Sequence, residues 1–409
     1  MLIVPLPPWQ LWGSTMVVLR LLPVTLLFWI LTGLCPARLD AADAVRVRGS
    51  LGLTGAYAPM AHMQLRGYTL WADQVNAAGG LLGRPVDLKI VDDGGLPERA
   101  RAHYAQLIQR QEADLYLAPY SSTLTGIVAP LLEAAGYPVL ASGAADDQLW
   151  SAETRYLFGL FTPASRYAVG FLELMALNGI ESVAVVGAND RFSRTLASGA
   201  KQWAGEFGLK VVFHQEFTKD TDKVDELVQA VRSSGAQAVV VCGHYKESVV
   251  VKRALDASAG PALPFFATVG PAMDRYGEDM GAAAQGVFSS SQWEVGIPHH
   301  PQDLTRFVVP FRERHGVDPS YHAADAYATG QILAAAVERV RSLDPARLRE
   351  VLSQGTFMSV IGRYGVDAQG RQVKHFPITV QWQDGQRRVV WPEALAGGAK
   401  PLIIKEGNL

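Results

Sequence analysis

The sequence has few cysteines and no excess of charge of either sign. Its 409 residues include 2 cysteines, 37 lysines and arginines, and 39 aspartates and glutamates, which gives a net charge of -2. Two cysteines exclude a disulfide framework and a zinc site built on cysteine. A nearly neutral chain has no broad positive field to hold a phosphate backbone, so a nucleic-acid partner is not expected. With 49% hydrophobic residues the chain is too apolar to be disordered, and its length predicts two lobes.

The usual motifs of catalysis are also missing. No serine has a glycine two positions before it, so the G-x-S-x-G pattern of esterases and lipases is absent. No lysine directly follows a glycine, which excludes a P-loop for nucleotide phosphates. The closest histidines, His299 and His300, are adjacent in a proline-flanked loop and would point apart rather than bind one metal ion. The sequence therefore predicts neither an enzyme nor a protein with a metal or cofactor.

The N-terminal segment has the pattern of an export signal. An uncharged apolar run, 21–34, follows Arg20 and precedes the small-residue stretch at 41–44. This order is typical of a secretory signal peptide, here residues 1–44, and the run is short for a membrane span. An uncleaved anchor, a lipid anchor on Cys35 and a start at Met16 rather than Met1 remain open. The sequence predicts a periplasmic protein, free or tethered.

Short apolar strands alternate with amphipathic helices in two series. The pattern predicts a parallel sheet covered on both faces, twice over. The first series has strands at 45–53, 86–92, 114–118 and 138–141, with helices at 62–78, 97–111 and 122–135. The second has strands at 182–187, 210–217, 236–242, 265–268 and 286–290, with helices at 192–207, 222–234 and 246–257. Two helices, 302–315 and 322–341, follow, and Asp384-Gly385 predicts a type I′ hairpin joining 378–383 to 386–391.

Small polar residues follow two strands of the first series. Tyr120, Ser121 and Ser122 come after the strand at 114–118, where the next helix begins. Hydroxyls there can cap the helix, and the same free N–H groups can bind an anion. The strand at 138–141 leads into a second small-residue stretch, Ser142, Gly143, Ala144 and Ala145. Since parallel strands end at one edge of a sheet, these two segments predict a crevice that binds a carboxylate.

Three segments carry a resemblance to a known family. They are LTGAYAPMAHMQLRGYTLWADQVNAAGGLLGRPVDLKIVDDG at 53–94, APYSSTLTGIVAPLLEAAGYPVLASGAAD at 118–146, and SSSQWE at 289–294. They resemble the periplasmic substrate-binding proteins of branched-chain amino-acid ABC transporters, and the resemblance runs from Val45 over nearly the whole chain. It implies a type I periplasmic-binding fold, with two doubly wound lobes, three crossing segments and a ligand held between the lobes. By analogy, 45–162 with 292–372 forms lobe 1, and 163–291 with 373–409 forms lobe 2.

The resemblance also implies site residues. The ligand carboxylate would bind Ser122 and the loop of Ser142, Gly143, Ala144 and Ala145, next to Tyr120 and Ser121. In lobe 2, Phe192 would provide an aromatic contact, and either His244 or Tyr245 a polar one. Met60 occupies a position at the mouth where tyrosine is common in the family, and Tyr57 is a possible substitute.

One departure from the family bears on the ligand. The family's glutamate that pairs the ligand ammonium should follow the strand at 265–268, where this chain has Val269-Gly270-Pro271. A buried ammonium without an anionic partner is unfavourable by several kcal/mol. Either another acid serves, with Asp274 and Glu294 as candidates, or the ligand has no amino group.

The favoured hypothesis is an exported receptor of an ABC importer. It would bind an amino acid or a related small carboxylate and deliver it to permease subunits in the membrane. Two alternatives stay open: a periplasmic ligand sensor of a signalling system, and a receptor for an amine-free aromatic or oxo acid.

Overall fold

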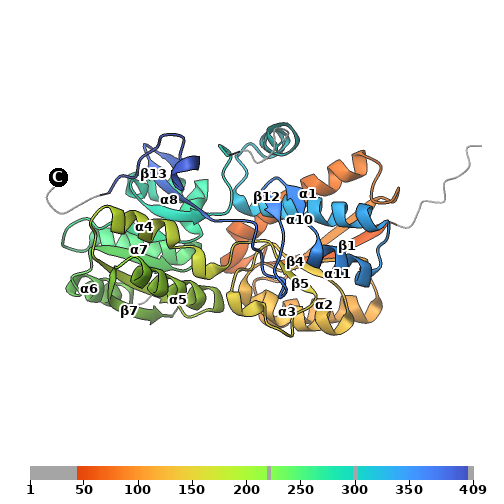
Figure 1. The fold of residues 1–409 in the computed structure, drawn as a ribbon, viewed down its shortest axis with the longest axis horizontal. Helices are drawn as coiled ribbons and strands as arrows, with labels where there is room; N and C mark the ends of the chain where they lie inside the picture. The colour runs from red at the N-terminus through yellow and green to blue at the C-terminus, as the bar shows by residue number, and fades with distance from the viewer. Residues whose placement is uncertain (1–43, 219–222, 298–302, 404–409) are drawn as a thin grey trace, which may run out of the picture. The chain divides into compact units, whose positions relative to one another are not determined.

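A parallel sheet and a larger mixed sheet, each with helices against it, make up most of the described chain (Figure 1). The computed structural model describes residues 44–218, 223–297 and 303–403. The predicted export signal, with Cys35 and both possible start residues, lies outside these residues up to position 43. None of the helices in the described ranges is long and apolar enough to cross a membrane.

The first sheet has five strands and is parallel throughout. Its order is β2-β1-β3-β4-β5, which is a doubly wound arrangement starting from the middle of the sheet. The strands are β1 (Val45–Leu51), β2 (Val86–Asp92), β3 (Leu115–Leu117), β4 (Val139–Ala141) and β5 (Leu157–Gly159). The helices that follow in sequence are α1 (Ala58–Ala77), α2 (Pro97–Arg110) and α3 (Ser122–Ala135).

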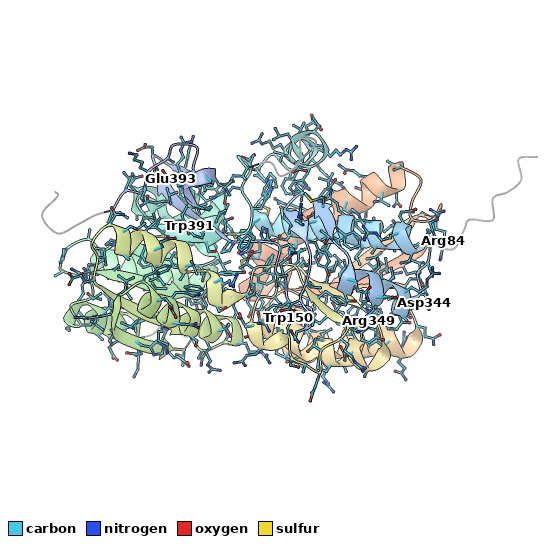
Figure 2. The ribbon with its side chains drawn as sticks, in the orientation of Figure 1. Arg84, Trp150, Asp344, Arg349, Trp391 and Glu393 are labelled. Carbon is cyan, nitrogen blue, oxygen red and sulfur yellow. The ribbon has the colours of Figure 1, made fainter. Side chains whose placement is uncertain are left out.

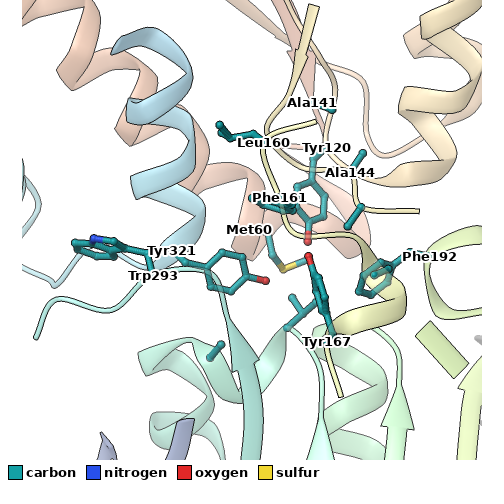
Figure 3. Packing of buried hydrophobic residues seen from close by; sticks show 14 of the residues in the cluster. Met60, Tyr120, Ala141, Ala144, Leu160, Phe161, Tyr167, Phe192, Trp293 and Tyr321 are labelled. Carbon is teal, nitrogen blue, oxygen red and sulfur yellow. The ribbon is translucent and has the colours of Figure 1, made fainter. Parts of the chain in front are cut away.

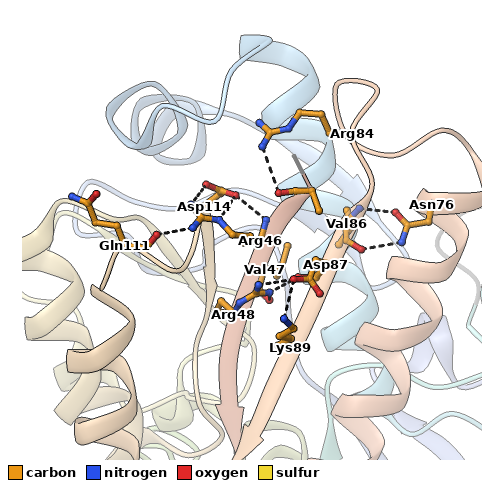
Figure 4. Close-up of polar contacts among 11 residues, drawn as sticks. Arg46, Val47, Arg48, Asn76, Arg84, Val86, Asp87, Lys89, Gln111 and Asp114 are labelled. Atoms are coloured by element: carbon orange, nitrogen blue, oxygen red, sulfur yellow. Dashed lines mark hydrogen bonds and ion pairs between the residues drawn. The ribbon is translucent and has the colours of Figure 1, made fainter. Parts of the chain in front are cut away.

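Polar side chains fix the register at the start of this sheet (Figure 4). Arg46 in β1 places its guanidinium 2.8 Å from the carboxylate of Asp114, just before β3. Arg48, two residues on, lies 2.6 Å from the carboxylate of Asp87 in β2. Asn76 at the end of α1 donates to the carbonyl of Val86 at 3.0 Å and accepts its N–H at 2.7 Å. The contacts of Arg46 and Arg48 join β1 to segments 68 and 39 residues away, and that of Asn76 joins the end of α1 to the start of β2.

The second sheet has seven strands in the order β14-β13-β10-β9-β8-β6-β7. Strands β6 to β10 are parallel, whereas β13 runs antiparallel to both β10 and β14. The strands are β6 (Ser182–Ala188), β7 (Lys210–Phe217), β8 (Ala238–Cys242), β9 (Phe265–Ala267), β10 (Phe288–Ser291), β13 (Ile378–Gln383) and β14 (Gln386–Trp391). The helices are α4 (Val169–Leu177), α5 (Arg191–Glu206), α6 (Val224–Ser233), α7 (Tyr245–Ala257) and α8 (Asp274–Met280).

Buried β-branched residues explain why the second sheet forms where it does. All five residues of β8, AVVVC, are buried, as expected for a central parallel strand covered on both faces. At the edge of the sheet formed by β14, Trp391, which is labelled in Figure 2, donates its indole N–H to Glu173 of α4 at 2.6 Å. The β13–β14 hairpin is therefore fixed to the second sheet by side chains as well as by strand pairing.

The C-terminal third of the chain returns to the first sheet before it reaches the hairpin. Three helices, α9 (Val309–His315), α10 (Tyr321–Val340) and α11 (Pro345–Gln354), follow β10, and a two-stranded sheet of β11 (Phe357–Ser359) and β12 (Gly362–Tyr364) comes next. Helix α10 packs along α1 so closely that a Cβ on Gly67 would lie 2.2 Å from the carbonyl oxygen of Ala323. The helix expected at 302–315 begins instead with a π-helical turn, Leu304–Val308, directly before the Val309-Pro310 start of α9.

The chain thus passes between the sheets three times, after β5, after β10 and before β13. These three segments are hydrogen-bonded to one another: the N–H of Thr162 donates to the side-chain oxygen of Gln292 at 3.0 Å, and its hydroxyl donates to the carbonyl of His375 at 3.2 Å. The predicted architecture, two doubly wound lobes joined by three crossing segments, is confirmed.

Candidate functional site

A small cavity lies where the carboxyl ends of the parallel strands from both sheets meet. The cavity is narrow in this arrangement of the two sheets, with a volume of about 10 Å³, roughly the space of one water molecule. Its lining comes from the loops after β3, β4, β5, β6, β8 and β9, from the first crossing segment and from the start of α10. The lining residues are Tyr120, Ser122, Gly143, Ala145, Phe161, Tyr167, Phe192, His244, Val269 and Tyr321. Figure 3 shows Tyr120, Phe161, Tyr167, Phe192 and Tyr321 converging on this region.

The first-lobe edge of the cavity is formed by the start of α3. Ser121, with φ 93°, accepts the N–H of Leu124 on its hydroxyl and so caps the helix. Ser122 faces the cavity, and its Oγ accepts the N–H groups of Ala145 at 3.1 Å and Asp146 at 3.0 Å. Because a serine hydroxyl also has one proton to donate, and no described residue accepts it, Ser122 keeps a donor for a ligand.

The loop after β4 approaches the cavity only because it contains glycine. A Cβ on Gly143 would lie 2.8 Å from the ring of Tyr120 and 3.0 Å from the amide nitrogen of Gln64. The carbonyl of Gly143 accepts the N–H of Ser121 at 3.0 Å, which holds the two predicted small-residue segments side by side. The crevice predicted at this sheet edge is therefore present as a geometric feature.

The second-lobe edge is built around His244. Its side chain is buried, and its ring centroid lies 5.2 Å from that of Phe192 and 5.2 Å from that of Tyr57. Nε2 of His244 is 3.7 Å from a carboxylate oxygen of Asp190, which itself caps α5 by accepting the N–H of Ser193. Tyr57 comes from the first sheet's side, so these rings meet across the cavity.

Val269 has an unusual backbone conformation. Its φ of 66° and ψ of -66° form a γ-turn in which the N–H of Gly270 donates to the carbonyl of Thr268 at 2.8 Å. For a β-branched residue this conformation is strained, and such strain is concentrated at functional sites. The strained turn directs an apolar side chain into the cavity at the position where the family resemblance leads one to expect an acid.

Three tyrosines and a histidine around the cavity are neutral. Burial raises the pKa of the phenols of Tyr120, Tyr167 and Tyr321 well above the usual value for tyrosine, so all three keep their protons. Burial and the nearby His244 lower the pKa of His322 to about 3, and its Nε2 lies 3.3 Å from the hydroxyl of Tyr120. Among the ten lining residues no side chain is a carboxylate. The site offers hydroxyl and imidazole groups set among aromatic rings.

Several predicted residues lie near the cavity without lining it. Ser142 is turned toward helix α1, where its Oγ is 2.5 Å from the hydroxyl of Tyr68. Ala144 and Met60 are buried, and Figure 3 shows Met60 beside the tyrosines. Tyr245 points away and donates to the carboxylate of Asp279 at 2.7 Å. Of the two alternatives after β8, the structure therefore places His244 in the cavity.

The two acids considered as ammonium partners lie elsewhere. Asp274 and Glu294 both contact the guanidinium of Arg387 in β14, Glu294 at 3.3 Å. Neither belongs to the cavity lining. In addition, no group of three or more histidine, cysteine or acidic side chains within the described ranges is placed to hold a metal ion.

Residue-by-residue reasoning missed three aromatic residues and the role of Val269. Phe161 and Tyr167 belong to the first crossing segment, and Tyr321 begins α10. No sequence signal pointed to Phe161 and Tyr167, because the strand before them, β5, has only three residues and was not predicted. Tyr321 is brought to the cavity by the packing of α10 on α1, which no local pattern reports.

Comparisons with known proteins agree with this geometry. The family model described as periplasmic binding protein matches residues 45–387. An amino acid binding protein of Pseudomonas aeruginosa is 25% identical over 81% of this chain and 88% of its own length. The leucine-binding protein LivK of Thermotoga maritima superimposes with a TM-score of 0.77 at 18% identity, over 85% of this chain and 97% of that one.

A solute-binding protein of an ABC transporter from Rhodopseudomonas palustris, solved in complex with benzoate, gives a TM-score of 0.74 at 19% identity, over 85% of this chain and 95% of that one. These solved structures support the type I periplasmic-binding fold, and the relatives are solute-binding receptors rather than enzymes. With its family match over most of its length, the chain belongs to the periplasmic binding protein family.

Proposed function

We propose that this chain is the exported receptor of an ABC importer, and that it captures a small carboxylate in the cavity between its two sheets. One observation carries the proposal. The cavity is lined from both sheets, with a hydroxyl donor at the start of α3 on one side and an imidazole on the other. Similar proteins support the ligand class, since one is named an amino acid binding protein and others were solved with isoleucine, leucine or benzoate.

The mechanism follows from the position of the cavity. A ligand that contacts both lobes binds the closed arrangement better than the open one, and so shifts the equilibrium toward closure. Closure excludes water and strengthens each polar contact with the carboxylate. Membrane permease subunits would then recognise the closed form and take up its ligand.

Lobe boundaries and export belong to the same proposal. The lobes comprise 45–162 with 292–372 and 163–291 with 373–409, supported by the two sheets and by the contacts among Thr162, Gln292 and His375 where the chain crosses. Residues 1–44 act as the export signal, with a lipid anchor on Cys35 as the alternative to a free protein. The intact mass of the protein isolated from its host distinguishes a free N-terminus near residue 44 from an acylated cysteine or an uncleaved chain.

Ligand-dependent stabilisation tests the receptor function. A ligand that binds only the folded protein adds RT ln(1 + [L]/Kd) to the free energy of unfolding, about 2.7 kcal/mol at a hundred times Kd. We expect at least one compound in a panel of aliphatic, aromatic and amino carboxylates to raise the melting temperature in a concentration-dependent way. No response to any carboxylate would contradict the proposal. Delivery to a permease is tested in the host, where deletion of this chain should abolish uptake of the compound identified.

A further inference from the structure

The cavity lacks a partner for a ligand ammonium group. Its ten lining residues include no carboxylate, and Val269 occupies the position where the family resemblance leads one to expect an acid. The side chain of Val269 is only 3% exposed, so it fills that position with an apolar surface. A protonated amine placed there would lose its water without gaining an anion.

Acids close to the cavity are already engaged. Asp190 accepts both the N–H and the hydroxyl of Ser193 at the start of α5. Asp146 accepts the guanidinium of Arg191 at 2.8 Å and the hydroxyl of Thr195. Neither aspartate lines the cavity, so neither replaces the missing acid.

On the same side of the cavity, His244 offers a hydrogen-bond donor, whereas an ammonium group would need an acceptor. The residue is 6% exposed, and its side chain takes part in a capping box with Glu247 at the start of α7. Neither ring nitrogen makes a hydrogen bond of good geometry within the described part of the chain. A buried imidazole without such bonds is unfavourable unless a ligand supplies one. An imidazole ring carries at least one N–H group in either charge state, and Nε2 lies 3.7 Å from the carboxylate of Asp190. His244 therefore presents a donor, which calls for an acceptor on the ligand.

Aromatic rings form the remaining walls. Five of the ten lining residues are phenylalanine or tyrosine: Tyr120, Phe161, Tyr167, Phe192 and Tyr321. Tyr167 and Phe192 meet edge to face, with centroids 5.6 Å apart and planes inclined by 69°. Such an arrangement suits a flat ring that packs against faces and edges of its neighbours.

We propose that the site selects a small aromatic carboxylate without an ammonium group, and that His244 is the residue of the second lobe that determines this preference. Ser122 and the loop of Gly143 and Ala145 hold the carboxylate. His244 donates to a ligand acceptor at the opposite edge, and Val269 excludes the charged amine. This inference depends on the proposed receptor function, since it names the ligand class of the same cavity.

Paired ligands that differ by one ammonium group test the preference. Phenylacetate and phenylglycine form one pair, 4-methylpentanoate and leucine the other, each titrated calorimetrically into the mature protein. We expect phenylacetate to bind at least about a hundredfold more tightly than phenylglycine, and more tightly than 4-methylpentanoate. Equal or tighter binding of the amino acids overturns the inference and leaves the receptor proposal in place. If none of the four compounds binds, the inference is overturned. If, in addition, no carboxylate of the wider panel raises the melting temperature, the receptor function is overturned as well.

Two pairs of variants assign the preference to residues. Val269→Glu should increase the affinity for phenylglycine at least tenfold relative to Val269→Gln. The glutamine side chain has the same shape as glutamate and the same backbone preferences, but no charge. His244→Phe keeps a ring beside Phe192 and should weaken at least tenfold the binding of 4-hydroxyphenylacetate, whose ring oxygen can accept from His244 at the edge opposite the carboxylate. Tyr245→Phe, the matched control on the next residue, should leave the affinity unchanged because that hydroxyl faces Asp279. Unchanged affinity in His244→Phe, with an unchanged melting temperature, removes His244 from the proposal. If the Val269 variants do not fold, the wild-type titrations decide.

Discussion

The hydroxyl of Ser122 has two roles, one in the loop after β4 and one toward the ligand. Measuring both stability and affinity in one substituted protein separates them. It accepts the N–H groups of Ala145 and Asp146, and its own proton is directed to no described residue. Ser122→Ala leaves two buried N–H groups without an acceptor, each of which costs about 1–3 kcal/mol of stability. We expect the variant to stay folded and to bind its carboxylate at least tenfold more weakly, as measured by melting temperature and calorimetric titration.

The matched control is Thr123→Ala on the next residue of α3, which is outside the cavity lining. Its affinity should equal that of the wild type. If Ser122→Ala binds normally while its melting temperature falls, the hydroxyl only supports the loop after β4 and does not contact the ligand.

Asp325 in α10 makes stability depend on pH. Its side chain is completely buried, neither carboxylate oxygen has a hydrogen-bond partner within the described ranges, and burial raises its pKa well above the usual value. The unfolded chain releases this proton above about pH 4, whereas the folded chain keeps it. Each unit of rising pH therefore lowers the free energy of unfolding by up to about 1.4 kcal/mol, until the folded-state pKa is reached.

Asp325→Asn removes this dependence. Its stability relative to the wild type should rise as the pH goes from 4 to 7, as measured by urea unfolding at each pH. The buried neutral His322 acts in the opposite direction, since the unfolded chain takes up its proton below about pH 6.5, but it is present in both proteins and cancels in the difference. Glu153→Gln, at an exposed position, is the control. A difference between Asp325→Asn and wild type that does not vary with pH would mean that Asp325 is ionised in the folded protein.

At single positions, sequence reasoning located residues that line the cavity where the backbone dictates the residue type. Gly143 and Ser122 were predicted because small residues and hydroxyls at strand ends have few other uses. His244 and Tyr245 were not distinguishable, because a one-residue shift at the start of a helix turns the side chain by about 100°. Val269 was recognised as the loss of an acid, but its γ-turn depends on buried Thr268, whose hydroxyl bonds to Gly243 in the neighbouring loop. Contacts between segments of this kind leave no local pattern.

At the level of elements, strong local signals were the dependable ones. The hairpin predicted from Asp384-Gly385 is present, with φ of 52° and 74° at the two turn residues, as a type I′ turn requires. Strands β5, β11 and β12, of three residues each, were not predicted, because they lie outside the alternation of strands and helices that marked the equally short β3, β4 and β9. Helix α11 was also missed, although Asp344 caps it and Pro345 begins it.

The contact between the loop after β4 and helix α5 links ligand binding to closure. Asp146 is fully buried and contacts Arg191 and Thr195, while its N–H donates to Ser122 in the cavity. The carboxylate comes from the first lobe and its partners from the second, so this contact exists only when the lobes are together. Arg191→Ala should therefore weaken ligand binding about tenfold, equivalent to about 1.4 kcal/mol, and enlarge the radius of gyration of the free protein in X-ray scattering.

Arg194→Ala is the matched control on the same helix. Arg194 pairs with Glu216 of β7, both side chains are about half exposed, and both belong to the second sheet's side of the chain. A surface pair of this kind contributes little, so the affinity and the radius should not change. An equal effect of the two substitutions would show that charge on α5, rather than the contact with Asp146, controls closure.

At the scale of the whole molecule, recognition is local. A net charge of -2 gives the surface no field to attract a carboxylate from a distance, so the polar groups at the cavity must supply the affinity. The strained backbone of Val269 and the ring of His244 lie at the cavity, while the sheets around them are packed with β-branched and aromatic side chains. Core packing of this kind can hold a strained residue in place at a binding site.

The reactivity of Cys242 measures whether a ligand in the cavity stabilises the second sheet around it. The thiol ends β8, two residues before His244, is fully buried, and has a pKa raised by burial, so it reacts with a thiol reagent only when the second sheet opens. In protein lacking residues 1–44, and therefore Cys35, we expect no reaction with a chromogenic disulfide until the protein unfolds. A ligand held at His244 should slow the reaction by the factor 1 + [L]/Kd, with Kd measured independently by titration. A fast reaction in the folded protein, or a rate that ligand leaves unchanged, would show that the end of β8 opens independently of the cavity and that ligand binding stabilises only the contact between the lobes.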